Sequence, residues 1–405
     1  MILRARMVVT MDGGPIENGS VAIRGDRIVD VGGVDDVKGR RTDQVIDLGD
    51  VALLPGLINA HCHLDYTSLR SRIPPPESFT EWIRSINAEK AKLSEQDYVT
   101  SIAEGFSEAA KFGTTTIANV TAFPQLIAKI QPSLRTWWLA EVMDVRGQDS
   151  AVNIIEGALG ALQVAKGRPG DVGLAPHALY TASRILFGVA QEASCETPLR
   201  LTTHLAESRE EMEMFRDAKG PLYDFLKEIG RDMSDCGGST PLRHFINTVS
   251  PIEGWIIAHL NELMDSDFDF LERSKTRFNI VHSPRSHRYF GHSTFPFQKL
   301  RSLGFNICLG TDSLASNDNL SLFAEMRAFQ KCEPGISPEE ILSMATLKAA
   351  LALGEPHSLG KLRAGYWADM VAVPFRGSRK NLFEAILASD NSVTFSMIAG
   401  KALGC

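Results

Sequence analysis

The chain has 405 residues, a formal net charge of −7 and 44% hydrophobic residues. This length fits one barrel domain with a small satellite domain, because such barrels usually take about 200–400 residues. The acidic balance, without a basic stripe, argues against a nucleic-acid partner. No run approaches the ~18 apolar residues that a membrane span requires, so we expect no membrane partner.

The cysteines indicate a reducing compartment. All six are scattered along the chain and no CxxC pair occurs, which is typical of reduced thiols in a cytosolic protein. Arg4 and Arg6 interrupt the N-terminus before an apolar signal-peptide core can form. We therefore expect a cytoplasmic protein, and the sequence leaves assembly into a homo-oligomer open.

Both ends of the chain have short alternating segments separated by turn residues, a pattern that predicts β-strands. At the N-terminus these segments are residues 7–10, 20–23, 27–31 and 45–48, and at the C-terminus they are 360–365, 368–373 and 393–398. We expect the two ends, residues 1–52 and 355–405, to build one small β-sandwich domain.

The region between the two ends, residues 53–354, alternates apolar strand-like runs with helical patterns. The candidate strands are residues 56–60, 114–120, 136–142, 172–175, 199–203, 255–258, 278–281 and 306–309. Helical periodicity is clearest over residues 98–111, 207–216, 221–230 and 338–352. Eight such β/α units predict an α/β fold of the (β/α)8 TIM barrel type.

The first candidate strand ends in His61-Cys62-His63. Side chains alternate along a strand, so the two imidazoles point to the same side and can bind one ion together. Imidazole suits zinc and its transition-metal neighbours, and barrel enzymes keep their chemistry at the carboxyl ends of the strands. Because two histidines on a strand are often mere surface residues, the pair gains weight only if other strand ends supply further ligands.

Two other strand ends supply such ligands. His204 follows the fifth candidate strand and Asp312 follows the eighth, so His61, His63, His204 and Asp312 can form a three-histidine, one-carboxylate shell. Alone, a histidine at a strand end is usually structural, and an aspartate after Gly-Thr usually caps a helix. Their joint occurrence at three strand ends favours a metal site.

Three more residues suit roles around the ion. Glu207 comes three residues after His204, and its carboxyl can relay protons or stabilise the N-terminus of the following helix. His259, at the end of strand six, can orient a water molecule or stabilise a developing oxyanion. His177 follows strand four and is expected at the pocket rim, in a structural or a substrate-binding role.

These residues lie in motifs that, together, are specific to one superfamily. The motifs are Pro55-Gly-Leu-Ile-Asn-Ala-His61-Cys-His63, Pro176-His177-Ala, His204-Leu-Ala-Glu207, Ala258-His259, Ser283-Pro-Arg-Ser286, Gly310-Thr-Asp312-Ser and Gly360-Lys-Leu…Gly365…Ala368-Asp369. Over nearly its whole length the chain resembles the amidohydrolase superfamily, and within it the aminohydrolase branch of deaminases and chlorohydrolase-like enzymes. The resemblance implies one divalent ion, zinc first with iron or manganese as alternatives, because strand four ends in His177 rather than a bridging lysine.

The resemblance also implies a mechanism for breaking a C–N bond. The ion would lower the pKa of its water from ~16 toward ~7. Asp312 would take the water proton during attack on an amino-bearing ring carbon, Glu207 would protonate the adjacent ring nitrogen, and His259 would steady the tetrahedral intermediate. The expected reaction is hydrolytic deamination of an aromatic ring, such as that of an adenine-type nucleoside derivative. Alternatives are an amide hydrolase, a dechlorinase and a non-catalytic barrel relative.

The substrate is less clear. Many purine-type deaminases of this branch carry Cys-Pro-x-Ser-Asn after strand seven, whereas this chain has the run 282–287, His-Ser-Pro-Arg-Ser-His. The departure argues against simple adenosine or guanine. Substrates with a nucleoside tail remain candidates. Of these we rank aminodeoxyfutalosine slightly above S-adenosylhomocysteine.

The candidate substrate contacts lie in two loops. Trp82, after strand one, can stack on a planar substrate or pack into the core, and the loop resembles the pocket-covering loop of the family. Arg70 and Arg285 can bind a substrate carboxylate in a fork. His287 lies in the strand-seven loop, residues 283–292, which we expect to face the metal ligands and to select the substrate.

Overall fold

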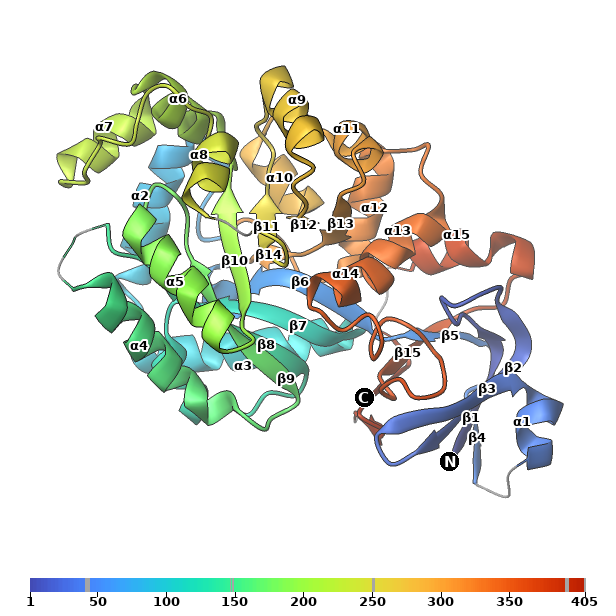
Figure 1. Cartoon of the computed structure of the whole chain (residues 1–405). Coiled ribbons are helices and arrows are strands. Elements are labelled where there is room, and N and C mark those ends of the chain that lie inside the picture. Colours follow the sequence, from blue (N-terminus) through green and yellow to red (C-terminus); the bar gives the residue numbers. More distant parts are fainter. Residues whose placement is uncertain (41–43, 146, 148, 250–251, 390–392, 404–405) are drawn as a thin grey trace.

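The computed structural model spans residues 1–405 and describes all of them except 41–43, 146, 148, 250–251, 390–392 and 404–405. Figure 1 shows two parts, a curled parallel sheet surrounded by helices and a second sheet to which both ends of the chain belong. None of the helices in the described residues is long and apolar enough to cross a membrane.

Eight parallel strands follow one another in sequence order around the curled sheet. They are β6 (Leu57–His63), β7 (Thr114–Thr121), β8 (Arg135–Val142), β9 (Gly170–Pro176), β10 (Arg200–Leu205), β11 (Ile256–His259), β12 (Asn279–His282) and β13 (Asn306–Leu309). Each of the eight predicted strands overlaps one of these. Their near-continuous apolar runs follow from burial on both faces, since the helices cover the outside and side chains fill the inside.

The sheet closes on itself through a short ninth strand. After β13 the chain passes through Gly310 and Thr311 into β14 (Asp312–Ser313), which pairs in parallel with the end of β6. The Thr311 amide donates to the carbonyl oxygen of His61 at 3.1 Å. The structure therefore confirms the mixed α/β fold, and closure brings the ends of strands one and eight together.

Helices connect the strands and cover the barrel. They are α1 (Val34–Arg40), α2 (Phe79–Lys90), α3 (Glu95–Lys111), α4 (Ala151–Leu162), α5 (Arg184–Glu196), α6 (Arg209–Asp217), α7 (Pro221–Glu228), α8 (Pro241–Thr248), α9 (Asp265–Ser274), α10 (Pro284–Phe290), α11 (Phe297–Ser302), α12 (Leu322–Cys332), α13 (Pro338–Met344), α14 (Leu347–Ala352) and α15 (Leu382–Leu387), with short 3₁₀ turns at Leu64–Leu69, Pro124–Lys129, Gln163–Ala165 and Arg379–Asn381. Serine N-caps precede many of them, among them Ser94, Ser183 and Ser208, and satisfy first-turn amides.

One helix boundary matters for the site. We predicted a helix over residues 207–216, but α6 begins at Arg209 because Ser208 caps it and accepts a hydrogen bond from the amide of Glu211. Glu207 therefore lies in the loop between β10 and α6, so the helix does not determine the direction of its side chain.

Two other predicted segments differ from the structure. The helix predicted over residues 338–352 is broken into α13 and α14, because Thr346 leaves helical geometry with φ of −134°. The β segment predicted over residues 360–365 forms turns, since Gly360 and Gly365 adopt left-handed φ angles of +81° and +91°. Strand formation resumes only at Met370.

The separate sheet joins the two chain ends. Its strands are β1 (Ile2–Val8), β2 (Ile16–Arg24), β3 (Arg27–Gly33), β4 (Val45–Asp47), β5 (Val51–Pro55), β15 (Met370–Pro374), β16 (Phe395–Ile398) and β17 (Lys401–Ala402). They run in the order β17-β16-β15-β5-β1-β2-β3, with β4 paired to β1. The antiparallel pairing of β5 with β15 links the N-terminal and C-terminal strands. The hydrogen bonds define one sheet, so the two-layer sandwich stays a prediction.

A buried ion pair attaches this sheet to the barrel. Arg135, at the start of β8, donates from Nε to Oδ2 of Asp369 at 2.8 Å and from Nη2 to Oδ1 at 3.2 Å. The amide of Ala399 also donates to Asp369, at 2.6 Å. Because both charged side chains are at least 95% buried, removing either would leave an unpaired buried charge.

Glu210 connects α6 to the N-terminus of α2. One carboxylate oxygen accepts from Ser78 Oγ at 2.8 Å and from the Phe79 amide at 2.9 Å. The other accepts from the Thr80 amide at 3.0 Å and from the Thr80 hydroxyl. A carboxylate at a helix N-terminus satisfies free amides and complements the helix dipole. Glu210 thus fixes α2 relative to the loop that carries Glu207.

Glu325 on α12 binds the first turn of α10 and the loop after β14. Its carboxylate accepts from the Arg285 amide at 2.9 Å and from Asn317 Nδ2 at 2.7 Å. Asn317 Nδ2 also donates to the carbonyl oxygen of Thr311 at 2.8 Å. Burial raises the pKa of Glu325 from its ordinary value of 4.5 to about 7.

We predict that Glu210→Ala loosens α2 without unfolding the barrel. Loss of a capping carboxylate costs about 0.5–2 kcal/mol, so amide exchange in the first turns of α2 should accelerate several-fold. Hydrogen–deuterium exchange read by mass spectrometry checks this. Replacement of the exposed Glu104 on α3 by alanine is the matched control. Unchanged exchange at residues 78–83 in the Glu210 variant would show that the contact does not hold the helix.

We predict a pH signature for Glu325. Between pH 4.5 and about 7 the native state holds a proton that the unfolded chain has lost. Its contribution therefore lowers the free energy of unfolding as pH rises, by up to about 1.4 kcal/mol per pH unit. Urea unfolding of the metal-free proteins should therefore show the free energy of unfolding of Glu325→Gln rising relative to that of the wild type as pH increases across this range. Parallel curves for the two proteins would contradict the assignment.

Candidate active site

Three imidazoles gather at the carboxyl end of the barrel. His61 and His63 come from the end of β6 and His204 from the end of β10, and all three residues are buried. Their ligand-capable nitrogens lie within 4.8 Å of one another. His63 Nε2 and His204 Nε2 are 3.1 Å apart. The sequence predicted that the first barrel strand ends at Ala60, but β6 continues to His63. Both histidines of the His-x-His motif therefore lie in the strand, as their spacing requires.

The chemistry of these imidazoles fits a divalent ion. Both nitrogens of His61 and Nδ1 of His63 lack a hydrogen-bond partner among the described residues, although they are buried. Burial, together with neighbouring histidines, lowers the pKa of His61 and of His63 well below the usual value, so both rings are neutral. Neutral imidazole is the form that binds metals. Unpaired buried nitrogens are costly unless an ion takes up their lone pairs.

The orientation of His204 is set by a neighbouring carbonyl. Its Nδ1 lies 2.8 Å from the carbonyl oxygen of His177, which can only accept. Nδ1 therefore carries the hydrogen, and Nε2 presents its lone pair toward His63.

Asp312 supplies a carboxylate to the same space. Its Oδ1 lies 3.8 Å from His61 Nε2 and 3.9 Å from His63 Nε2. Its Oδ2 accepts from Ser286 Oγ at 2.6 Å and from Ser316 Oγ at 3.3 Å. The serines orient the side chain and leave Oδ1 directed at the imidazoles. The structure thus brings together all four residues that the sequence proposed as metal ligands.

Glu207 and His259 form a second group with Asp312, with ligand-capable atoms within 4.8 Å of one another. Glu207 Oε1 lies 3.6 Å from His259 Nε2. Burial, with the charges of Asp312 and Glu211, raises the pKa of Glu207 well above its usual value, which favours the protonated form. Burial lowers the pKa of His259, so its ring is neutral.

The loop that carries Glu207 is rigidly held. Glu211 accepts hydrogen bonds from the amides of Ala206 and Glu207 at 3.0 and 2.7 Å, and Asn261 Nδ2 donates to the Glu207 carbonyl at 3.0 Å. Ala206 and His259 both adopt left-handed φ angles, 49° and 71°. Such conformations cost free energy in residues other than glycine and concentrate at functional sites.

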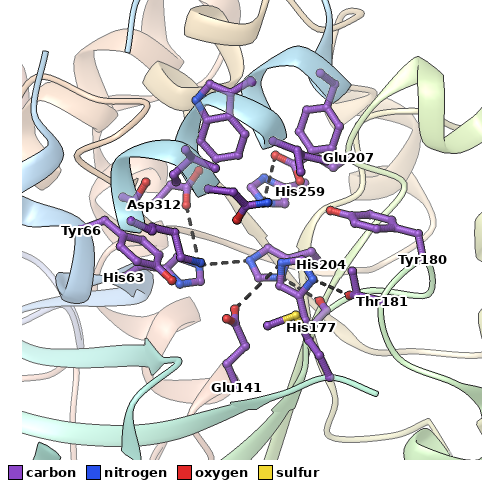
Figure 2. Close-up of a pocket in the computed structure, with 18 residues that line it drawn as sticks. His63, Tyr66, Glu141, His177, Tyr180, Thr181, His204, Glu207, His259 and Asp312 are labelled. Atoms are coloured by element: carbon purple, nitrogen blue, oxygen red, sulfur yellow. Dashed lines mark hydrogen bonds and ion pairs between the residues drawn. The ribbon is translucent and has the colours of Figure 1, made fainter. Parts of the chain in front are cut away.

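A cavity of about 160 Å³ opens onto this cluster, as Figure 2 shows. Its lining combines site residues with one face of α2 and the ends of β8 and β9: His63, Tyr66, Phe79, Trp82, Ile83, Ile86, Asn87, Lys90, Glu141, Met143, His177, Tyr180, Thr181, His204, Glu207, His259, Asp312 and Ser313. Aromatic and aliphatic side chains with a few convergent polar groups are typical of a small-molecule site.

Two of the predicted substrate contacts line this cavity. Trp82 packs edge-on against Phe290, with ring centroids 4.9 Å apart, and stacks near Phe79 at 6.0 Å. His177 Nδ1 lies 2.6 Å from Thr181 Oγ1. Trp82 therefore packs against two neighbouring aromatic rings and also lines the cavity.

The other three predicted contacts do not belong to the described lining of this cavity. Arg70 pairs with Glu108 near the surface. Arg285 donates to Asp318 at 2.8 Å and to Asn319 Oδ1 at 2.8 Å. A substrate anion could reach its guanidinium only by displacing these partners. His287 hydrogen bonds through Nδ1 to Asn261 at 3.1 Å and so supports the Glu207 loop.

Sequence reasoning missed several residues of the site. Glu141 and Lys90 line the cavity but lie in a buried strand and in an amphipathic helix, where no local pattern marks them. Ser286 closes the motif Ser283-Pro-Arg-Ser286, but the sequence assigns it no role. Its hydrogen bond to Asp312 shows that it orients that carboxylate.

The sequence of this chain is similar to those of known proteins. The sequence matches the Amidohydrolase family over residues 52–403. The 5-methylthioadenosine/S-adenosylhomocysteine deaminase of Desulfitobacterium hafniense is 30% identical over 401 residues, covering 92% of this chain and 85% of that protein. The 5′-deoxyadenosine deaminase of Methanosarcina mazei is 28% identical, with 93% and 84% of the two chains covered.

Solved structures share the fold. Helicobacter pylori aminofutalosine deaminase, in complex with methylthio-coformycin, has a TM-score of 0.86 at 21% identity, with 99% of both chains covered. An adenosine deaminase from Xanthomonas campestris with bound zinc has a TM-score of 0.83 at 22% identity, with 99% and 92% covered. Sequence match, identity and architecture agree, and the chain belongs to the Amidohydrolase family.

Proposed function

We propose that this protein is a metal-dependent hydrolase that acts on C–N bonds other than peptide bonds. It removes the amino group from an aromatic ring, such as that of an adenine-type nucleoside derivative, with the help of water activated by a divalent ion. The observation that carries the proposal is the pair of neutral imidazoles with unpaired nitrogens, His61 and His63, beside two buried carboxyl groups, Glu207 and Asp312, that line one cavity. The names of the deaminase relatives support the same reaction.

His61, His63, His204 and Asp312 would hold the ion. A divalent ion bound there supplies a Lewis acid that makes water a strong nucleophile at neutral pH. No described residue donates a hydrogen bond to Asp312 Oδ1, so this oxygen can accept a proton from the attacking water. Ser286 holds the other oxygen and fixes the direction of that transfer.

Glu207 is proposed as the acid for the ring. Its environment favours the protonated carboxyl, which can donate to a ring nitrogen next to the reacting carbon. The neutral His259 ring, 3.6 Å away, can hydrogen bond to the oxygen that adds to that carbon. Water adds to the ring carbon, and one of its protons passes through the carboxylates to the departing amino group, which leaves as ammonia. The other proton returns to Glu207 as the carbonyl group of the product forms and replaces the proton given to the ring nitrogen.

Substrate binding is proposed for the aromatic side of the cavity. Trp82 offers a ring face for a planar base, and His177 lies beside the imidazole cluster. Arg70, Arg285 and His287 remain proposed contacts only for a substrate that extends beyond the cavity.

We retain the finer sequence-based expectations as proposals. These are zinc as the resident metal, with iron or manganese as alternatives, a cytoplasmic location, a two-layer sandwich for the terminal strands, and domain boundaries at 52/53 and 354/355. In the structure β5 of the separate sheet continues to Pro55.

The test is ammonia release by the zinc-loaded protein from aminopurines, aminopterins, 5′-methylthioadenosine, S-adenosylhomocysteine and 5′-deoxyadenosine. We expect turnover of at least one aromatic amine.

Glu207→Gln should lose roughly 10²–10⁴-fold in kcat, the usual contribution of a general acid, while keeping its metal. The exposed Glu156 on α4, changed to glutamine, is the matched control. Silence across the aromatic amines would refute the deaminase proposal, and chloride or amine release would identify a dechlorinase or an amide hydrolase. Near-full activity of the Glu207→Gln variant would contradict the proposal that Glu207 is the general acid.

A further inference from the structure

Tyr180, in the loop after β9, is a buried tyrosine in the wall of the cavity. No described residue forms a hydrogen bond with its hydroxyl. Figure 2 shows this hydroxyl directed toward the space between Glu207 and His204. Burial raises the pKa of Tyr180 well above its usual value, so the phenol stays protonated and can donate. A buried donor that faces a cavity without a partner is satisfied when a ligand binds.

Packing within the protein explains most of the other tyrosine hydroxyls. Three of them donate to backbone carbonyl oxygens, namely those of Tyr98, Tyr289 and Tyr366. Tyr66 also has an unpartnered hydroxyl, but this atom is fully buried, and the ring stacks on His63 with centroids 5.9 Å apart. Tyr66 therefore packs behind a candidate metal ligand, whereas the hydroxyl of Tyr180 points at the reacting groups.

A buried arginine fixes the main chain at Tyr180. Arg231, in the loop after α7, donates from Nε to the carbonyl oxygen of Tyr180 at 3.0 Å and from Nη2 to that of Leu179 at 2.9 Å. Its terminal nitrogens also donate to the two carboxylate oxygens of Asp235 at 2.7 and 2.8 Å, and Nη1 donates to the carbonyl oxygen of Asp232 at 2.6 Å. All five N–H groups of the guanidinium thus have acceptors, and the side chain is only 8% exposed.

The metal site has a separate anchor in the same loop. The carbonyl oxygen of His177 accepts from the amide of His204 at 2.9 Å, from its Nδ1 at 2.8 Å and from Thr203 Oγ1 at 3.2 Å. These bonds attach the start of the loop to β10. Arg231 holds the next part of the loop, at Leu179 and Tyr180. Loss of Arg231 should therefore displace Tyr180 and leave the candidate metal ligands in place.

The position of the hydroxyl indicates which group it binds. Glu207 is the proposed acid for the ring nitrogen next to the reacting carbon, and Tyr180 lies beside it in the cavity wall. When water adds to that carbon, negative charge moves onto this nitrogen. In a ring with a second nitrogen one carbon further on, both nitrogens share that charge. A fixed neutral donor at the second nitrogen stabilises the charge as it develops.

We propose that Tyr180 donates a hydrogen bond to a second ring nitrogen of the substrate, and that Arg231 is a positioning residue that acts on the reaction through Tyr180. This inference rests on the proposed deamination. It adds the requirement that the substrate ring has two nitrogens on either side of one carbon. Arg231 itself is outside the described lining of the cavity, and its donors are all used within the protein.

The test is a double-mutant cycle on ammonia release from 5′-methylthioadenosine by the zinc-loaded protein. Tyr180→Phe should lose roughly 10- to 100-fold in kcat, the range for one hydrogen bond to a charged group, with KM changed by less than about threefold. Arg231→Lys keeps the charge but not the planar fork, and should lose roughly three- to tenfold in kcat. In the Tyr180→Phe background, Arg231→Lys should change kcat by about twofold or less.

The matched control is Arg135→Lys. Arg135 is an equally buried arginine whose carboxylate partner, Asp369, attaches the terminal sheet. This variant should melt at a lower temperature and keep the wild-type kcat. All variants should keep one zinc ion per chain. If Arg231→Lys does not fold, Asp235→Asn, which weakens the hold on the guanidinium, should show the same dependence on Tyr180.

Three results would overturn the inference. They are a wild-type kcat in Tyr180→Phe, an equal loss from Arg231→Lys in both backgrounds, and loss of zinc from Arg231→Lys. The first removes the role of the hydroxyl. The second shows that Arg231 does not act through Tyr180, and the third shows that it supports the metal site instead.

If the wild type releases no ammonia, the proposed function fails, and binding of 5′-methylthioadenosine then tests the contact. Calorimetry on the zinc-loaded proteins gives the Kd. A Kd that rises at least about fivefold in Tyr180→Phe, with no further rise on adding Arg231→Lys, supports the contact. The same Kd in all variants, or no binding to the wild type, contradicts it.

Discussion

The parallel pairing of β14 with β6 positions the whole site. Asp312 and Ser313 pair with Cys62 and His63, so the carboxylate after strand eight and the imidazoles of strand one share one edge of the barrel. Asp312 holds this register with φ of 58°, a conformation that costs on the order of 1–3 kcal/mol outside glycine. Hydrogen bonds from two serines to its Oδ2 help to offset that cost. Closure of the barrel and assembly of the candidate ligands therefore depend on the same strand pairing.

The glutamates around the cavity fall into two groups by what they contact. Glu210, Glu211 and Glu325 accept hydrogen bonds from backbone amides and stabilise the frame around the cavity. Glu207 and Glu141 accept none from described residues and face the cavity instead. Buried carboxylates without donors are unfavourable in the folded protein alone. Their retention in one cavity is best explained by groups that a substrate brings.

The sequence allowed the barrel and the candidate ligands to be predicted, because both have local signatures. Strand runs are marked by continuous apolar residues. His61 and His204 follow such runs directly, and Asp312 follows one after Gly310 and Thr311. Substrate contacts have no such signature. Arg285 resembles an anion-binding residue in the sequence, but its partners Asp318 and Asn319 come from another loop and become visible only in the fold. Glu141 was missed for the same reason, since only the neighbouring strand shows that it faces His177.

The central claim is that the buried imidazoles bind one divalent ion, and metal content tests it most directly. Elemental analysis of the purified protein, after loading with zinc and removal of the excess, should give one ion per chain. The same treatment of His61→Ala/His63→Ala should leave the protein without bound metal, because two of the four proposed ligands are gone while His204 and Asp312 remain. Full metal retention in this variant, or a wild-type protein that binds no divalent ion, would contradict the account.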